Sequence, residues 1–160
     1  MSYPNPEQGL MPSFIDRLID PESGGTRGRK WYTIEEVEAT VLRDLEDLLN
    51  TRQTHTGLPP DFKELHKSIY AYGLPDLTSL NAVTPAQREE ICRIIEETVA
   101  TFEPRLKDAR AFIMGNNDGN DRTIRFRIEA RLNVEPAPAV AFETELELTT
   151  GHYRVNAAHT

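Results

Sequence analysis

The stretch Ala100 to Leu106, ATFEPRL, lies where one pattern of apolar residues gives way to another. Before it, apolar residues recur every three or four positions, which is the period of a helix. After it they recur at every second position, which is the period of a strand. Pro104 ends the helical part, because the residue before a proline is pushed out of the helical region. The stretch therefore divides a helical N-terminal part from a C-terminal part made of strands.

The helical part carries two clear start signals. Thr33 is followed by Glu36 at the third position, and Thr84 is followed by Gln87 at the same spacing. Each pair forms a capping box, in which both side chains bond to free backbone N–H groups of the first turn. The expected helices cover residues 33–52, 65–73 and 84–102.

The strand part alternates most clearly over residues 123–134. Arginines and Glu129 oppose its apolar face, and glutamates oppose the apolar face of residues 140–148. If the chain folds back at residues 135–138, two registers are plausible. Each sets two arginines against two glutamates, where an ion pair contributes about 0.2–1 kcal/mol. Each also opposes Glu129 to Glu143 or Glu145.

This order of elements predicts an α+β protein, with N-terminal helices packed on a C-terminal antiparallel β-meander. Residues 31–156 are expected to form a single domain. Residues 1–30 are expected to form a flexible tail, with a short amphipathic helix at 13–19 and a linker at 21–30.

The core is expected between the second long helix and the longest strand. The helix offers Ile91, Ile95, Val99 and Phe102, and the strand offers Ile124, Phe126, Ile128 and Leu132. Both sets are uninterrupted apolar faces, so we expect each to bury the other.

The composition limits the function classes. The net charge of −8 argues against a general nucleic-acid binder, which would show a basic face. One cysteine, Cys92, gives no disulfide framework and fits a reducing compartment. No apolar run is long enough to span a membrane, so we expect a cytoplasmic protein without direct membrane insertion.

Signals for catalysis and for metal binding are weak. The four histidines are scattered, and the loop NNDGND at residues 116–121 lacks the ligand spacing of a calcium site. Cys92 lies beside an apolar stripe, as a small buried thiol does. We therefore expect no cofactor, no metal and no enzymatic activity.

Three stretches in a fixed order carry a family resemblance. They are VLRDLEDLLNTR (41–52), SIYAYGLPDLTSL (68–80) and FEPRL (102–106), and IRFRIEARL and FETELELTTGHYRV follow them. Together they resemble the TssE family, the small wedge subunit of the type VI secretion baseplate. That family is similar to a baseplate wedge protein of contractile phage tails that is labelled lysozyme-like. The resemblance covers residues 13 to 155.

The resemblance implies a structural role in an assembly. Its partners would be the wedge subunits TssF and TssG, the outer subunit TssK, and the sheath proteins TssB and TssC, whose polymerisation it would help to start. Such a protein would lie at the cytoplasmic face of the inner membrane, held there through the assembled baseplate. The lysozyme-like label suggests an alternative, a peptidoglycan glycosidase, which would need a working pair of carboxylates.

Several residues are candidates for contact with partners. The family's Glu-Pro-Arg motif matches Glu103, Pro104 and Arg105. Glu103 and Arg105 form either a local surface ion pair, which stabilises little, or a contact with a wedge subunit. We expect Arg105→Ala to leave the melting temperature nearly unchanged. Tyr72 and Asp76 are weaker candidates.

The C-terminal strands offer a second candidate surface. An edge strand can accept a strand from another chain. The segment from Phe142 to Val155 is the candidate edge for the first sheath layer. Glu143, Glu145 and Glu147 would discourage indiscriminate pairing there.

Overall fold

The computed structural model describes Leu18 and residues 32–54, 57–77, 84–114, 123–135, 137–147 and 149–158. The linker expected at 21–30 and the loop at 116–121 lie outside the described residues, as does the helix expected at 13–19, apart from Leu18. The chain divides into two compact units, Met1–Val41 and Leu42–Thr160.

Both long helices start at their predicted capping boxes. Helix α2 (Ile34–Asn50) follows Thr33, whose Oγ1 accepts the Glu36 N–H at 3.2 Å, while Glu36 Oε2 accepts the Thr33 N–H at 2.9 Å. Helix α3 (Pro85–Phe102) has the same reciprocal pair between Thr84 and Gln87. Among the described residues, no helix combines the length and apolar character that crossing a membrane requires.

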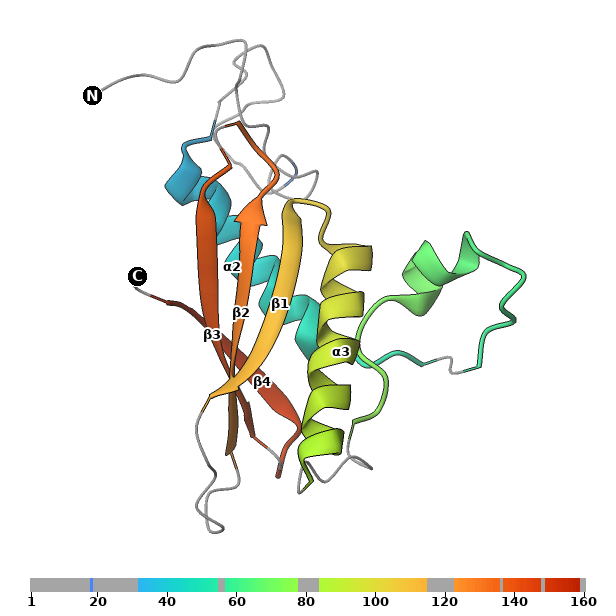
Figure 1. The fold of residues 1–160 in the computed structure, drawn as a ribbon. Coiled ribbons are helices and arrows are strands. Elements are labelled where there is room, and N and C mark those ends of the chain that lie inside the picture. The colour runs from blue at the N-terminus through green and yellow to red at the C-terminus, as the bar shows by residue number, and fades with distance from the viewer. Residues whose placement is uncertain are drawn as a thin grey trace. The chain divides into compact units, whose positions relative to one another are not determined.

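Four antiparallel strands follow the helices and form one sheet. They are β1 (Leu106–Met114), β2 (Thr123–Leu132), β3 (Ala139–Glu147) and β4 (His152–Ala157), in the order β1-β2-β3-β4. Figure 1 shows α3 running beside β1. The fold class is therefore α+β with a C-terminal meander, as predicted.

The register of β2 on β3 confirms one part of the charge prediction and corrects another. Arg125 lies opposite Glu145, and Arg127 lies opposite Glu143. Glu129 lies opposite Ala141, so the predicted like-charge pair is wrong. The true register avoids that repulsion by setting Glu129 against an uncharged methyl group.

One face of the sheet is buried. Its side chains on β2 are Ile124, Phe126, Ile128, Ala130 and Leu132, each at most 7% exposed. Ile91, Ile95 and Val99 of α3 are buried as predicted, and α3 packs along β1, while the direct packing of this helix face on β2 stays a prediction. Phe102 is half-buried, so its predicted place in the core is wrong. It packs edge-on against Tyr72, with ring centroids 5.4 Å apart.

The segment between the long helices differs from its prediction. Two short 3-10 helices, η2 (Leu65–Lys67) and η3 (Ile69–Ala71), replace one helix. Ile69 is 91% exposed, so the expected apolar stripe is not buried. Gly73 has φ +103°, and a Cβ there would lie 2.3 Å from Thr51 O. This close approach, with the Leu74 N–H donating to Thr51 O at 2.8 Å, ties the segment back to the end of α2.

Burial of Tyr153 predicts a loss of stability at alkaline pH. Burial raises its pKa to about 12, while Arg52 acts in the opposite direction. The unfolded phenol ionises near pH 10, so the unfolded state loses its proton first as the pH rises. The contribution of the protonated Tyr153 phenol to the free energy of unfolding should be complete below about pH 10. It should fall by up to about 2 kcal/mol between about pH 10 and pH 12. Urea unfolding of the wild type and of Tyr153→Phe at a series of pH values checks this.

Tyr70→Phe is the matched control, because Tyr70 is 45% exposed. The Tyr153→Phe protein should lose less stability over this range than the wild type, whereas the Tyr70→Phe protein should follow the wild type. Equal slopes for all three proteins would contradict the assignment to Tyr153.

Candidate partner-binding site

The joint between α3 and β1 is held by its own backbone bonds. The Glu103 N–H donates to Val99 O at 2.9 Å, and the Leu106 N–H donates to Glu103 O at 3.0 Å. The Asn133 N–H, just after β2, donates to Arg105 O at 2.7 Å. Pro104 is exposed between them. The sequence Glu-Pro-Arg therefore forms a tight turn that fixes the entry of the chain into the sheet.

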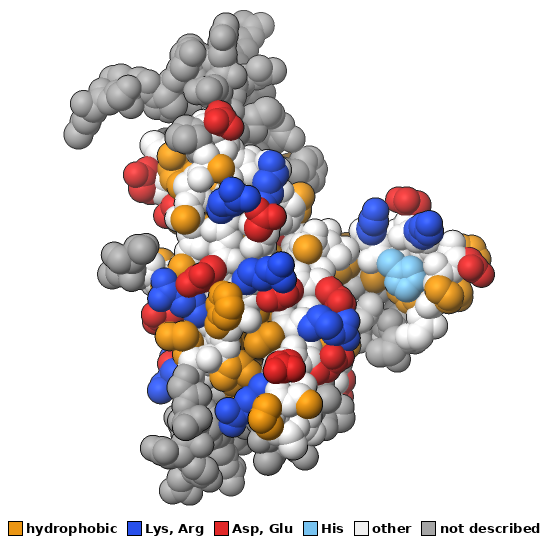
Figure 2. Space-filling view, viewed as in Figure 1, with side chains coloured by type: hydrophobic (Ala, Val, Ile, Leu, Met, Phe, Trp, Pro, Cys, Tyr) orange, Lys and Arg blue, Asp and Glu red, His pale blue; other side chains and the backbone are white. Residues whose placement is uncertain are grey.

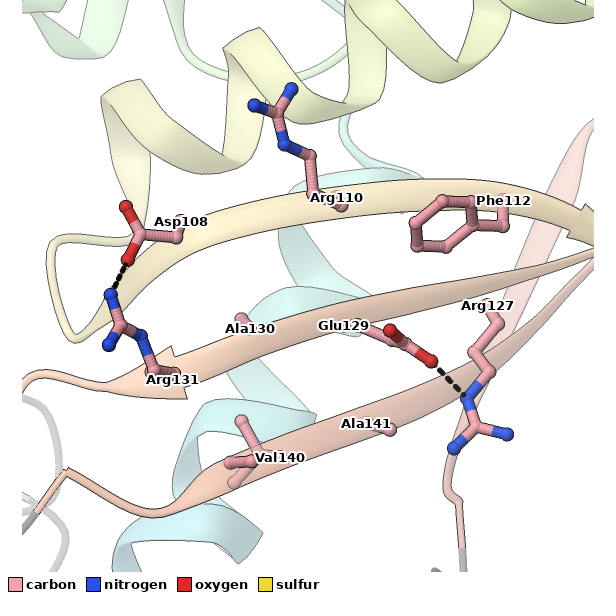
Figure 3. Close-up of a pocket in the computed structure, with 10 residues that line it drawn as sticks. Asp108, Arg110, Phe112, Arg127, Glu129, Ala130, Arg131, Val140 and Ala141 are labelled. Carbon is pink, nitrogen blue, oxygen red and sulfur yellow. Dashed lines mark hydrogen bonds and ion pairs between the residues drawn. The ribbon is translucent and has the colours of Figure 1, made fainter.

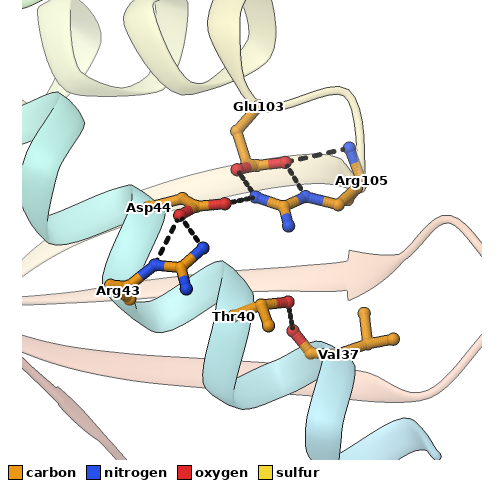
Figure 4. Close-up of polar contacts among 6 residues, drawn as sticks. All are labelled: Val37, Thr40, Arg43, Asp44, Glu103 and Arg105. Atoms are coloured by element: carbon orange, nitrogen blue, oxygen red, sulfur yellow. Dashed lines mark hydrogen bonds and ion pairs between the residues drawn. The ribbon is translucent and has the colours of Figure 1, made fainter. Parts of the chain in front are cut away.

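A cluster of charged side chains crosses this joint (Figure 4). Arg105 Nε donates to Glu103 Oε1 at 2.7 Å, and Arg105 Nη2 donates to Glu103 Oε2 at 2.5 Å. Arg105 Nη2 also lies 2.6 Å from Asp44 Oδ2, and Arg43 donates to Asp44 Oδ1 at 2.7 and 2.9 Å. We call these four residues, Arg43, Asp44, Glu103 and Arg105, the joint network.

The joint network is largely withdrawn from solvent. The side chains of Glu103, Asp44 and Arg105 are 5%, 22% and 29% exposed. Glu103 is the one buried charged residue in the part of the chain that the structure describes. Burial disfavours the charge on Arg105, but hydrogen bonds and charges from Glu103 and Asp44 outweigh it and raise the pKa of the guanidinium. The charged state of Arg105 is therefore fixed.

This burial corrects the expectation for Arg105→Ala. That expectation assumed a surface side chain, and the assumption is wrong. Loss of Arg105 would leave the Glu103 carboxylate buried without its bidentate partner, which is costly. Contact of Glu103, Pro104 and Arg105 with a partner stays a prediction. Because Glu103 and Arg105 also support the fold, a substitution there would change stability as well as any such contact.

Tyr72 lies near the joint network. Its ring packs on Phe102, the residue before Glu103. Burial, followed by the negative charges of Asp47, Asp44 and Glu103, raises the pKa of the Tyr72 phenol. The structure thus brings Tyr72 and the Glu-Pro-Arg turn together at one end of α3.

The other predicted site residues lie elsewhere. Asp76 is 3.8 Å from Arg52 in an exposed ion pair. Glu143, Glu145 and Glu147 lie on β3, and Glu145 pairs with Arg125 at 3.0 Å. Since β3 pairs with both β2 and β4, it is an internal strand. The part of the candidate edge Phe142 to Val155 that lies in β3 is therefore internal, so Glu143, Glu145 and Glu147 are not on the edge strand, and the part in β4 forms the C-terminal edge.

Sequence patterns do not single out Asp44 and Arg43. Asp44 lies 61 positions before Arg105, within a polar stripe of α2 that also holds other acidic residues. The one signal in the sequence is that FEPRL and VLRDLEDLLNTR both carry the family resemblance. In the structure the two stretches are in contact through Arg105 and Asp44.

The described residues hold no group of three histidine, cysteine, aspartate or glutamate side chains that is suited to a metal ion. Cys92 is half-buried beside β1, and burial followed by the charge of Glu96 raises the pKa of its thiol. A raised pKa favours the unreactive thiol over the thiolate. This agrees with the packing role expected for Cys92.

Comparison with known families decides what kind of protein carries this joint. Residues 35–137 match the family described as "Baseplate wedge protein gp25". The chain belongs to this family. The match spans α2, α3, β1 and β2, and so contains every member of the joint network. A search of curated proteins found no match.

A solved structure shares the fold of this wedge-family chain. It belongs to "The baseplate complex from the type VI secretion system", with 18% identity and a TM-score of 0.52. The similarity covers 79% of this chain and 97% of that one. The family assignment and this shared fold confirm the resemblance that the sequence motifs indicated.

Proposed function

We propose that this chain is a structural wedge subunit of a type VI secretion baseplate. It joins the wedge subunits TssF and TssG, with TssK outside, and it helps to start polymerisation of the TssB and TssC sheath. It has no enzymatic role, and the assembled baseplate holds it at the cytoplasmic face of the inner membrane. The observation that carries this proposal is the wedge-family match over residues 35–137, which contains the whole joint.

The Glu-Pro-Arg turn is suited to hold a wedge partner. Buried bonds fix Glu103 and Arg105, so the turn has little conformational freedom to lose on binding. Pro104 is exposed at its tip, and the Arg43 side chain is 42% exposed at its rim. The partner would contact this tip and rim while the buried carboxylate keeps the turn in shape.

The two edges of the sheet differ in how they are protected. Helix α3 packs along β1, and Glu96 Oε1 of α3 accepts the outward Ala111 N–H at 2.9 Å. A bulge between Lys107 and Arg110 further disturbs this edge. Covering and bulging are common ways of blocking an edge against foreign strands. The β1 edge is thus a poor acceptor for a sheath strand.

The β4 edge is capped at its start, and beyond Tyr153 none of the residues that the structure describes bonds to its outward backbone groups. Asn50 of α2 accepts the Tyr153 N–H at 2.9 Å and donates to Tyr153 O at 2.8 Å, as a neighbouring strand would. Ala158 N–H instead donates inward, to Ala141 O. Inward and outward bonding alternate along an antiparallel strand. Val155 and Ala157 therefore direct their backbone groups outward, and a sheath strand would pair there.

This proposal predicts a specific effect of Ala157→Pro. The Ala157 N–H points away from β3, so a proline there removes an outward donor without breaking the sheet. The melting temperature should change little, because the residue is exposed at the edge. Reconstitution with purified wedge subunits and sheath proteins should show sheath growth with the wild type and greatly reduced growth with this variant.

Ala157→Ser is the matched control, since it keeps the N–H. It should support sheath growth like the wild type. Normal growth with a folded Ala157→Pro protein would rule out pairing at the β4 edge. Loss of wedge assembly itself with that variant would show instead that β4 faces a wedge subunit.

A further inference from the structure

The face of the sheet opposite its buried side carries a hollow that the proposed contacts do not use. We call it the alanine hollow, and it is lined chiefly by Phe112, Arg127, Glu129, Arg131, Ala139 and Ala141 (Figure 3). Its volume is about 490 Å³. It lies across three strands, because β3 places Ala141 and Ala139 opposite Glu129 and Arg131 of β2. The short methyl groups leave room beside long neighbours.

The alanine hollow has an apolar wall and an unused hydrogen-bond donor. Phe112 is 50% exposed, although it is a large apolar residue. Arg127 lies opposite it on β2, and its Nε is buried without a hydrogen bond. This Nε lies 3.1 Å from Glu129 Oε1 in an ion pair that lacks hydrogen-bond geometry. A buried donor without an acceptor is costly, so Arg127 would be stabilised if its side chain turned out toward an incoming acceptor.

Charge favours an acidic ligand here. Arg110, Arg127 and Arg131 line the hollow with Asp108 and Glu129, which gives a local charge of +1 on a chain whose net charge is −8. Arg131 forms an ion pair with Asp108, and Arg110 forms one with Glu96 of α3. Arg127, which lies opposite Glu143 of β3, is thus the lining arginine whose Nε has no hydrogen-bond acceptor among the described residues. Figure 2 shows charged side chains of both signs interleaved with apolar ones on one face of the molecule.

We propose that the alanine hollow docks an acidic, extended segment of a partner protein. A carboxylate of the segment bonds to Arg127, and a neighbouring apolar side chain packs on Phe112 and the alanine methyl groups. A segment suits the site better than a small molecule does, because the hollow is an open surface across three strands, not an enclosed cleft. This surface is separate from the Glu-Pro-Arg turn and from the β4 edge, and its test does not depend on the baseplate proposal.

The test uses two free peptides and the full chain labelled with ¹⁵N. The probes are acetyl-Glu-Leu-Glu-Leu-Glu-amide and the same peptide with lysine in place of glutamate. The acidic peptide should shift the amide signals of Phe112, Arg127 and Ala141 at concentrations up to about 1 mM, the range of a weak single contact. The lysine peptide should leave them unchanged. No shift with the acidic peptide, or equal shifts with both, would overturn the proposal.

Matched variants distinguish binding in the alanine hollow from general attraction of the acidic peptide to arginine. Arg127→Gln should weaken acidic-peptide binding about tenfold, the loss expected for one charge-assisted hydrogen bond. Arg125→Gln removes the same charge from the same face of β2 outside the hollow, and it should bind like the wild type. Ala141→Leu should abolish binding by filling the hollow while keeping Arg127. Equal losses in the two arginine variants, or full binding by a folded Ala141→Leu protein, would contradict the proposed site.

Discussion

Replacing Glu103 with alanine is expected to destabilise the protein by about 2–4 kcal/mol. Breaking a fully buried ion pair costs about 3–5 kcal/mol, because it leaves one charge unpaired. The Arg105 side chain is 29% exposed, so solvent recovers part of that loss. Arg105→Ala should cost a similar amount, since it leaves the Glu103 carboxylate buried. Urea unfolding followed by circular dichroism measures both values.

Glu97→Ala is the matched control for this prediction. Glu97 also pairs with an arginine, Arg93 at 2.6 Å, but the Glu97 side chain is 63% exposed. Exposed pairs of this kind contribute little, so no clear change in stability is expected. If Glu103→Ala is as stable as the Glu97 variant, the joint network does not support the fold, and its charges would then be free to serve contact alone.

Phe126→Ala should destabilise the protein more than any of the other substitutions, by about 3–5 kcal/mol. Phe126 is 1% exposed at the centre of β2, and its ring meets Tyr153 edge-on with centroids 6.0 Å apart. Phe102→Ala should cost clearly less, about 1–2 kcal/mol, because Phe102 is half-buried and loses less contact. The same unfolding assay compares the two variants directly.

The order of these two losses is the decisive result. Both substitutions remove the same side-chain atoms, so burial dominates the difference, and the smaller change of intrinsic propensity, which favours alanine in a helix over a strand, acts in the same direction. A larger loss for Phe102 than for Phe126 would place the centre of the core at the end of α3, contrary to the structure.

Local chemistry explains which elements the sequence predicts well. The capping boxes at Thr33 and Thr84 mark both helix starts, because their bonds reach only three residues along the chain. The alternation over β2 predicts its buried face for the same reason, since neighbouring side chains point to opposite faces. All the residues that form such a signal lie within a few positions of one another in the sequence.

Features set by distant residues were not predictable in this way. Asp44 joins Arg105 through the packing of α2 near the joint, and no local pattern marks it. The register that opposes Glu129 to Ala141 depends on the turn between β2 and β3. Two 3-10 helices replace the helix expected at 65–73, and the tight packing of Gly73 on Thr51 after them joins residues that are distant in the sequence. The place of β3 inside the sheet depends on whether β4 pairs with it.

Assembly with the larger wedge subunits is the sharpest test of the proposed baseplate role. The chain should be co-expressed with TssF and TssG from the same organism, purified through a tag on TssG, and passed over a sizing column with light scattering. We expect the chain to elute with both partners in one complex of defined mass. Elution of a folded chain alone, at its own mass of 18.2 kDa, would contradict the proposed role.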